Sequence, residues 1–299
     1  MEYASTAMLG HTHGQKATPT TVGKEFKVFA LRLRYLVEDM SKVPVKAKFS
    51  GTVGCFNAHT AAYPEYDWPE LAEKFVTSLG LTYNPVTTQI ENHDYLCLLL
   101  SHLNIISNVI RDLDSDVWLY LSNDYFHEKM KEGEVGSSVM PHKVNPINFE
   151  NSMANGEIAC GLIDSLVNNL SVSRMQRDLS DSSKLRNIGV IIAHSLISMK
   201  QTLRGLSKLV VNTDKLNAEL EENYEVLTEA VQTIMRKNGY ENGYEILKEI
   251  SRGKILDQES LRLFVSGLDI DQNDREYLMN LTPETYIGLA EKLALDNQR

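Results

Sequence analysis

Residues 96–120 read LCLLLSHLNIISNVIRDLDSDVWLY, and this segment carries the clearest structural pattern in the chain. Its apolar residues recur at alternating steps of three and four, which is typical of an α-helix packed along its length against other helices. The positions are Leu96, Leu99, Leu103, Ile106, Ile110, Leu113, Val117 and Tyr120. No proline or glycine interrupts residues 86–132, so nothing there breaks a long helix.

Two further segments repeat this spacing. One stripe consists of Ile192, Leu196, Met199, Leu203, Leu206 and Val210, and another of Leu162, Leu166 and Leu170. A helix is also expected from Thr20 or Thr21 to about Met40, with Thr20 as a suitable N-cap, and a short one near residues 69–79. No convincing alternation of the strand type competes with these patterns. The sequence therefore predicts an all-α protein, a bundle of long, nearly parallel or antiparallel helices.

The spacing of glycines and prolines divides the chain. Residues 131–146 hold two glycines and two prolines between helical regions, which favours a functional loop. After about Asn212 the charge rises and the predicted helices become shorter. We expect a central long-helix bundle over 1–210, with its catalytic loop at 131–146, and a small helical domain over 211–299.

Composition excludes several classes of protein. Lys plus Arg number 30 against 40 for Asp plus Glu, so the net charge of −10 disfavours a nucleic-acid or anionic-membrane partner. Three cysteines without a CxxC pair disfavour a zinc site or a disulfide framework, and His11 and His13 lack a nearby third metal ligand. No apolar run of 18 residues and no secretory signal are present, so a cytoplasmic location is expected.

The predicted loop contains an unusual concentration of polar groups. Residues 136–150 read GSSVMPHKVNPINFE, in which two hydroxyls follow a glycine and a Lys, an Asn and a Glu precede or open a helix. A surface turn is the plainer interpretation. The string nevertheless resembles the signature of the fumarase/aspartase superfamily, G-S-S-x-M-P-x-K-x-N-x-x-x-x-E, at every fixed position.

That resemblance implies a reversible β-elimination of fumarate from a succinyl group. Such chemistry needs a base for the carbon-bound proton, stabilisation of the carbanion and an acid for the leaving atom. In the superfamily the first loop serine is the base, which implies Ser137. Ser138, Lys143 and Asn145 would bind the substrate, with Lys143 and Asn145 polarising its carboxylate. Glu150 would be a supporting residue.

Near the N-terminus the chain reads Thr12-His13-Gly14-Gln15, followed by Lys16-Ala17-Thr18-Pro19. A lone histidine is more often structural than catalytic. The string is similar to the T-H-G-Q-x-A-T-P segment of the adenylosuccinate lyase family, which implies His13 as general acid and Thr12 as a substrate contact. Lys16 replaces the proline that is usual there, which affects the local backbone rather than the chemistry.

Two more segments carry the same resemblance. Arg177, Ser182 and Arg186 follow an R-x4-S-x3-R spacing, which without other indications would be a solvated charged face but resembles the nucleotide site of that family. Arginine suits phosphate because its fork binds bidentately. Residues 87–94, TTQIENHD, imply Gln89 as a substrate-binding residue, with His93 structural.

The resemblance spans nearly the whole chain and implies more than single residues. It implies a homotetramer with sites shared between subunits, a small nucleotide substrate and no cofactor or metal. It also leads us to expect that the family's N-terminal domain, with its T-S-E-D-like and N-H-D-like segments, is missing. Two alternatives stay open: a non-catalytic helical scaffold of the same family, and an argininosuccinate lyase.

Overall fold

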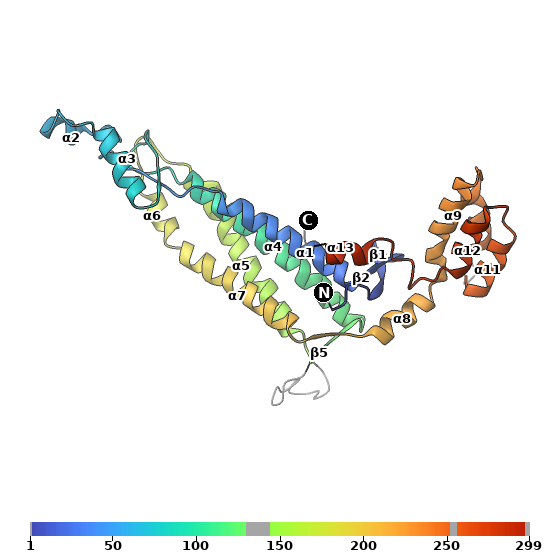
Figure 1. Ribbon diagram of the computed structural model, residues 1–299. Helices are drawn as coiled ribbons and strands as arrows, with labels where there is room; N and C mark the ends of the chain where they lie inside the picture. Colours follow the sequence, from blue (N-terminus) through green and yellow to red (C-terminus); the bar gives the residue numbers. More distant parts are fainter. Residues whose placement is uncertain (1, 130–143, 252–255, 297–299) are drawn as a thin grey trace. The chain divides into compact units, whose positions relative to one another are not determined.

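The computed structural model describes residues 2–129, 144–251 and 256–296 (Figure 1). Helices dominate, which confirms the predicted all-α class. The helices are α1 (Val22–Ser41), α2 (Asn57–Ala62), α3 (Trp68–Ser78), α4 (Asp94–Ser122), α5 (Ile147–Leu170), α6 (Ser180–Leu185), α7 (Ile188–Leu206), α8 (Thr213–Glu221), η1 (Tyr224–Leu227), α9 (Thr228–Lys237), α10 (Gly243–Ser251), α11 (Gln258–Ser266), α12 (Gln272–Asn280) and α13 (Ala290–Leu295). Short strands are β1 (Ala7–Thr12), β2 (Gln15–Thr21), β3 (Lys46–Ala47), β4 (Thr82–Tyr83), β5 (Phe126–Glu128) and β6 (Leu209–Val211).

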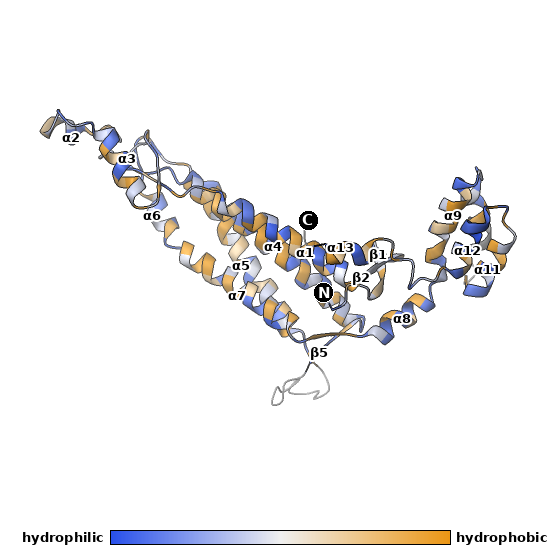
Figure 2. Cartoon of the chain, viewed as in Figure 1, coloured by the Kyte–Doolittle hydropathy of each residue, from blue (hydrophilic) through white to orange (hydrophobic). Residues whose placement is uncertain are grey.

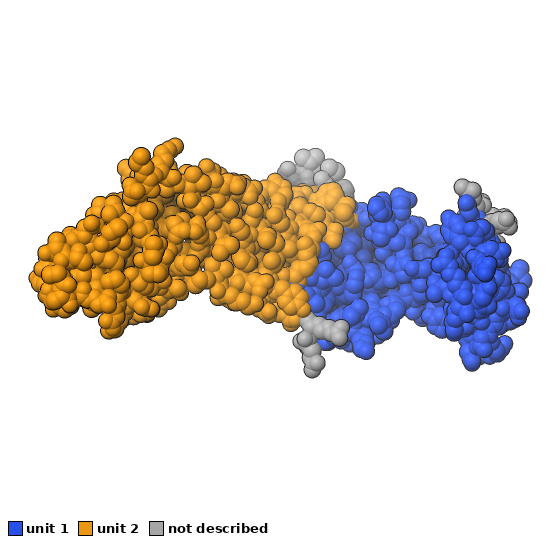
Figure 3. Space-filling model, turned by 90° about the horizontal axis from the view of Figure 1, so that it is seen from above, with its two compact units in different colours: residues 1–31, 120–127, 210–299 blue, residues 32–119, 128–209 orange. Residues whose placement is uncertain are grey.

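Contacts group these elements into two compact units (Figure 3). The first contains residues 1–31, 120–127 and 210–299, and the second contains residues 32–119 and 128–209. The division into 1–210 and 211–299 stays a prediction. Each unit is described by itself below.

The second unit is a bundle of α4, α5 and α7, which lie side by side (Figure 1). Its core joins Leu100 of α4, Leu166 and Leu170 of α5, and Ile191 of α7. The predicted stripe of α4 is confirmed at its centre, because Ile106, Ile110, Leu113 and Val117 are all buried. Among the described helices, α4 alone is long and apolar enough to span a membrane. Its packing in this core is the ordinary reason for such a composition.

The stripe predicted for α7 behaves differently. Ile192, Leu196 and Leu203 are exposed, Leu203 to 65%. Figure 2 shows that apolar residues recur along α7. Apart from Ile191, the face of α7 that packs on α5 is instead made of small and polar residues: Ser195, Ser198, Thr202 and Gly205. Periodicity correctly located an apolar face on this helix, but no part of the chain that the structure describes covers that face.

Small residues let α5 and α7 approach closely. A Cβ atom added at Gly205 would lie 2.5 Å from the ring of Phe149, which is fully buried. At Gly156 of α5 an added Cβ atom would lie 3.4 Å from the Ser198 hydroxyl of α7, and 3.1 Å from the Arg111 side chain of α4. The Phe149 ring of α5 therefore packs directly against the backbone of α7 at Gly205.

Inside this bundle lies a buried polar cluster. The hydroxyl of Thr202 lies 2.9 and 3.0 Å from the two carboxylate oxygens of Asp114, which has no exposed surface. Ser152 links Thr202 at 2.7 Å to Ser198 at 3.0 Å. Burial raises the pKa of Asp114 to about 6, although hydrogen bonds from Ser152 and Thr202 oppose the shift.

The first unit has its own core, which packs the β1–β2 hairpin against α8 to α12. Ala7 and Leu9 of β1 meet Leu220, Leu227 and Met235 in this core. The hairpin was not predicted, because its two strands are short and lack clear alternation. It leads directly into α1, whose first turn is capped by the Thr21 hydroxyl, 3.2 Å from the backbone nitrogen of Lys24. Thr21 rather than Thr20 is therefore the cap.

Candidate functional site

Two segments that the sequence singled out meet in the second unit. The backbone N–H of Gln89 donates to the carbonyl of Gln176 at 3.3 Å. This contact brings residues 87–93 beside residues 173–186, which are far apart along the chain. Two of the predicted substrate-binding residues, Gln89 and Arg177, therefore come from neighbouring segments.

A buried carboxylate strengthens this junction. Asp181 lies in the first turn of α6, and its two oxygens lie 3.3 Å from His93 Nε2 and 3.4 Å from the Arg177 guanidinium. His93 lies immediately before α4 begins, and its backbone has a positive φ of 64°. Its ring therefore links the start of α4 to α6, in agreement with a structural role.

The segment of Arg177, Ser182 and Arg186 has hydrogen-bond donors that are available to a ligand. Arg186 follows α6 and is exposed, and Ser182 is half-buried within α6. Neither side chain forms a hydrogen bond or ion pair with another residue in the described ranges. Arg177 is held by Asp181 yet still has further N–H groups. A serine hydroxyl between two arginines is suited chemically to an anionic oxygen group such as phosphate.

Lys48 was missed by sequence reasoning. Its Nζ donates to the carbonyls of Gly51 at 2.8 Å, Thr88 at 3.1 Å and Gln89 at 2.8 Å. Partial burial lowers the pKa of this ammonium group. A lysine that binds backbone carbonyls has no motif, so the sequence offers no pattern from which to find it.

A further predicted binding residue, Asn145, and the predicted supporting residue Glu150 lie elsewhere in this unit. Asn145 precedes α5 and Glu150 lies in its first turn, where the carboxylate accepts a hydrogen bond from the indole of Trp118 at 3.3 Å. Helix α5 has 24 residues and is about 36 Å long. Lys184 of α6 contacts the carbonyl of Asn169, at the opposite end of α5. Glu150 and the Arg177 segment are therefore separated by most of the bundle.

Three predicted site residues lie outside the described residues: Ser137, Ser138 and Lys143. The same holds for most of the predicted loop at 131–146, of which only residues 144–146 are described. The assignments of the general base and of two loop contacts therefore stay predictions.

The predicted general acid lies at the tip of the β1–β2 hairpin, in the first unit. Thr12 pairs with Gln15, and between them His13 and Gly14 have φ values of 54° and 71°, so they form a two-residue turn. Both Thr12 and His13 are exposed. A positive φ is unfavourable for histidine, so the hairpin must hold His13 in place.

Contacts behind the tip supply that support. Lys16 donates to the side chain of the buried Asn223 at 2.8 Å. Thr18 and Tyr286 both bind the carboxylate of Glu229, at 2.6 and 3.0 Å. The lysine that replaces the usual proline thus has its own anchor in this chain.

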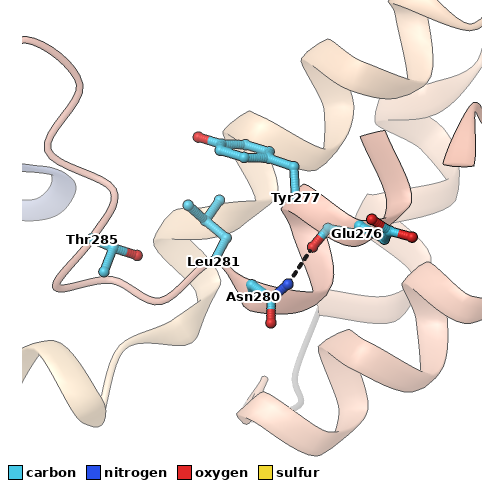
Figure 4. Close-up of a pocket in the computed structure, with 5 residues that line it drawn as sticks. All are labelled: Glu276, Tyr277, Asn280, Leu281 and Thr285. Atoms are coloured by element: carbon cyan, nitrogen blue, oxygen red, sulfur yellow. Dashed lines mark hydrogen bonds between the residues drawn. The ribbon is translucent and has the colours of Figure 1, made fainter. Parts of the chain in front are cut away.

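A shallow pocket in the first unit is lined by Glu276, Tyr277, Asn280, Leu281 and Thr285 (Figure 4). It contains none of the predicted site residues and a single carboxylate. Within the described ranges, no group of three His, Cys, Asp or Glu side chains is arranged to hold a metal ion.

Comparison with solved structures shows the fold. The 3-carboxy-cis,cis-muconate lactonizing enzyme of Pseudomonas putida matches 98% of this chain with a TM-score of 0.76 and 19% identity, over 66% of its own chain. A fumarate lyase of Mesorhizobium sp. BNC1 matches 98% with a TM-score of 0.75 and 17% identity, over 67% of its chain.

The sequence matches two family models and several curated proteins. A family model described as "Lyase" matches residues 1–160, which places the chain in the class of helical lyases. A second model, "Adenylosuccinate lyase C-terminal", matches residues 173–287. The adenylosuccinate lyases of Legionella pneumophila (strain Corby) and Escherichia coli (strain K12) are 49% and 47% identical over 98% and 97% of the chain. The chain belongs to the adenylosuccinate lyase family. It spans 64% of the length of these two relatives.

Proposed function

We propose that this chain acts as an adenylosuccinate lyase, which eliminates fumarate from adenylosuccinate to give AMP. The same reaction on the succinyl-carboxamide ribotide of purine synthesis would give the carboxamide and fumarate. The observation that carries the proposal is the 49% identity to an adenylosuccinate lyase over 98% of the chain. The match of the motifs around His13, Gln89, Ser137 and Arg177 supports it. A cytoplasmic location belongs to the same proposal.

In the proposed mechanism Ser137 removes a proton from the succinyl carbon beside a carboxylate. Lys143 and Asn145 bind that carboxylate and stabilise the negative charge that spreads into it. The carbon–nitrogen bond then breaks, its electron pair goes to nitrogen, and His13 donates a proton to this atom. Fumarate and AMP leave, and proton return from Ser137 to His13 through solvent restores both groups.

Binding of the nucleotide is assigned to the junction in the second unit. Arg177, Ser182 and Arg186 would hold the phosphate, and the side-chain amide of Gln89 would bind the substrate beside them. Thr12 would contact the substrate next to His13, and Ser138 would do so next to the base. The free donors of Ser182 and Arg186 support this assignment.

We further propose that the active site is shared between copies in a homotetramer. Glu150 and Asn145 lie at one end of α5 and Arg177 at the other, about 36 Å apart along the helix. Residues that lie so far apart in one chain can belong to the same site if a second copy of the chain contributes one group of them. The exposed apolar stripe of α7, Ile192, Leu196 and Leu203, supports such an assembly.

The decisive experiment measures fumarate release from adenylosuccinate by this chain, with Ser137→Ala as the control. Release that disappears in the variant is the expected result. Release from argininosuccinate instead would favour that alternative, and near-normal turnover in Ser137→Ala would remove Ser137 as the base. A folded chain without turnover on either substrate would favour a helical scaffold.

A second variant tests the acid. His13→Ala is expected to slow the departure of nitrogen strongly, because no other group is assigned to protonate it. His127→Ala serves as the matched control, since His127 also lies on a short strand and binds Asn212 at 3.0 Å outside any motif. Equal losses in the two variants would contradict the role of His13.

A further inference from the structure

The backbone of Gln89 is held from two sides. Its N–H donates to the carbonyl of Gln176 at 3.3 Å, and its carbonyl accepts from Lys48 Nζ at 2.8 Å. Its side-chain amide forms no hydrogen bond with any described residue. The main chain is therefore fixed while the functional amide remains available for a ligand.

Lys48 uses all its donors in this arrangement. An ammonium group has three N–H bonds, and the carbonyls of Gly51, Thr88 and Gln89 accept all three. No carboxylate among the described residues forms an ion pair with it. Its charge is thus directed to peptide oxygens, and it has no donor left for a substrate phosphate.

The surrounding loop supports the same segment. The buried Ser50 hydroxyl lies 3.4 Å from the hydroxyl of Thr87. At Gly54 the backbone has a φ of 82°, and a Cβ atom there would overlap the carbonyl oxygen of Thr87. Strands β3 and β4 pair in parallel directly before these two stretches, Lys46 with Thr82 and Ala47 with Tyr83. Residues 46–54 therefore form a cradle for residues 87–89.

We propose that Lys48 is a positioning residue, which fixes the backbone of Gln89 so that its amide faces the substrate beside Arg177. The inference rests on the proposed function, because Gln89 binds substrate only there. Lys48 itself does not touch the substrate. Its removal should therefore act only through Gln89.

Hydrogen–deuterium exchange tests the positioning directly. In Lys48→Met the amides of residues 87–90 should exchange about tenfold faster, as expected when a hydrogen bond to a charged group is lost. Lys74→Met is the matched control, because Lys74 forms an exposed ion pair with Glu70 in the same unit. Unchanged exchange in Lys48→Met would overturn the proposal, whether or not the chain is active.

A double-mutant cycle tests the functional consequence. Gln89→Ala and Lys48→Met should each raise KM for adenylosuccinate several-fold with a smaller effect on kcat, and the double variant should match Gln89→Ala alone. If the increases in KM of the two single variants multiply in the double variant, Lys48 acts independently of Gln89, and the proposal is overturned. Absence of fumarate release from the unmodified chain would instead count against the proposed function, and exchange would then decide the positioning role.

Discussion

His93 Nε2 lies 3.3 Å from the Oδ2 atom of Asp181, although 88 residues separate them in sequence. The same carboxylate holds Arg177 through its other oxygen at 3.4 Å. Because Asp181 is buried, these contacts are shielded from water and bind the start of α4 to the arginine segment. The candidate nucleotide site therefore depends on a histidine to which we assign a structural role.

Replacement of Asp181 by Asn should weaken this junction. We expect a loss of about 1–3 kcal/mol in the free energy of unfolding, because two charged or polar partners lose a buried acceptor. Urea denaturation measures this loss. Asp39→Asn is the control, since Asp39 forms only an exposed pair with Lys42 and its loss should change stability much less. Equal effects of the two variants would contradict the role of Asp181.

Asp114 should make the stability of the bundle depend on pH. Its pKa is about 6 in the folded chain, above the ordinary 3.8, so the folded state binds the proton more tightly than the unfolded state. The resulting stabilisation is complete below about pH 4 and is lost as the pH rises through about 6, by up to about 3 kcal/mol.

Asp114→Asn should remove this slope, since the amide cannot ionise. Unfolding free energies at pH 5 and pH 7.5 would measure the difference. Asp112→Asn is the control, because the exposed Asp112 pairs with Arg32 and its loss leaves the buried carboxylate intact. A slope that persists in Asp114→Asn would assign the pH dependence to another group.

Gly205→Ala should destabilise the bundle by about 1–3 kcal/mol, because the added methyl would lie 2.5 Å from the Phe149 ring. Thermal unfolding measures the effect, and Phe149→Leu in the same chain should recover part of it. Gly161→Ala is the matched control in α5. That position has open space, so alanine should stabilise the helix there by up to about 1 kcal/mol. Destabilisation in both variants would argue against a specific clash.

Leu203→Glu should reduce self-association, because it places a charge in the exposed apolar stripe of α7. Sedimentation velocity would detect a shift toward smaller species. Leu263→Glu is the control, since Leu263 on α11 is exposed to 75% and lies outside that stripe. An unchanged sedimentation coefficient in Leu203→Glu would show that this stripe takes no part in the assembly.

The sequence predicted helix α4 and its buried centre correctly, because an apolar period of this length has few alternative explanations. It also predicted that Ile192, Leu196 and Leu203 form one face of α7. It could not show whether that face is covered within the chain, since hydropathy does not identify the partner. The adjacent face, with Ser195 and Ser198, is mostly small and polar and was not predicted to pack.

The candidate site was predicted in the same uneven way. Gln89 and Arg177 were recognised from their motifs, but their proximity depends on tertiary contacts that spacing does not encode. Lys48 carries no pattern that separates it from a solvated lysine. The hairpin at His13 was not predicted, because its turn depends on the positive φ of only two residues, His13 and Gly14, and no periodic pattern marks it.

The seat of Phe149 against Gly205 also has a consequence for where α5 begins. The close contact between the Phe149 ring and Gly205 fixes how α5 and α7 are aligned along their axes. A slip by one helical turn would displace the helix ends by about 5.4 Å. Asn145 and Glu150 lie within four residues of Phe149, so they would move with any such slip. An apolar contact in the bundle thereby sets the position of Asn145, which is assigned to the substrate, and of Glu150, which is assigned a supporting role.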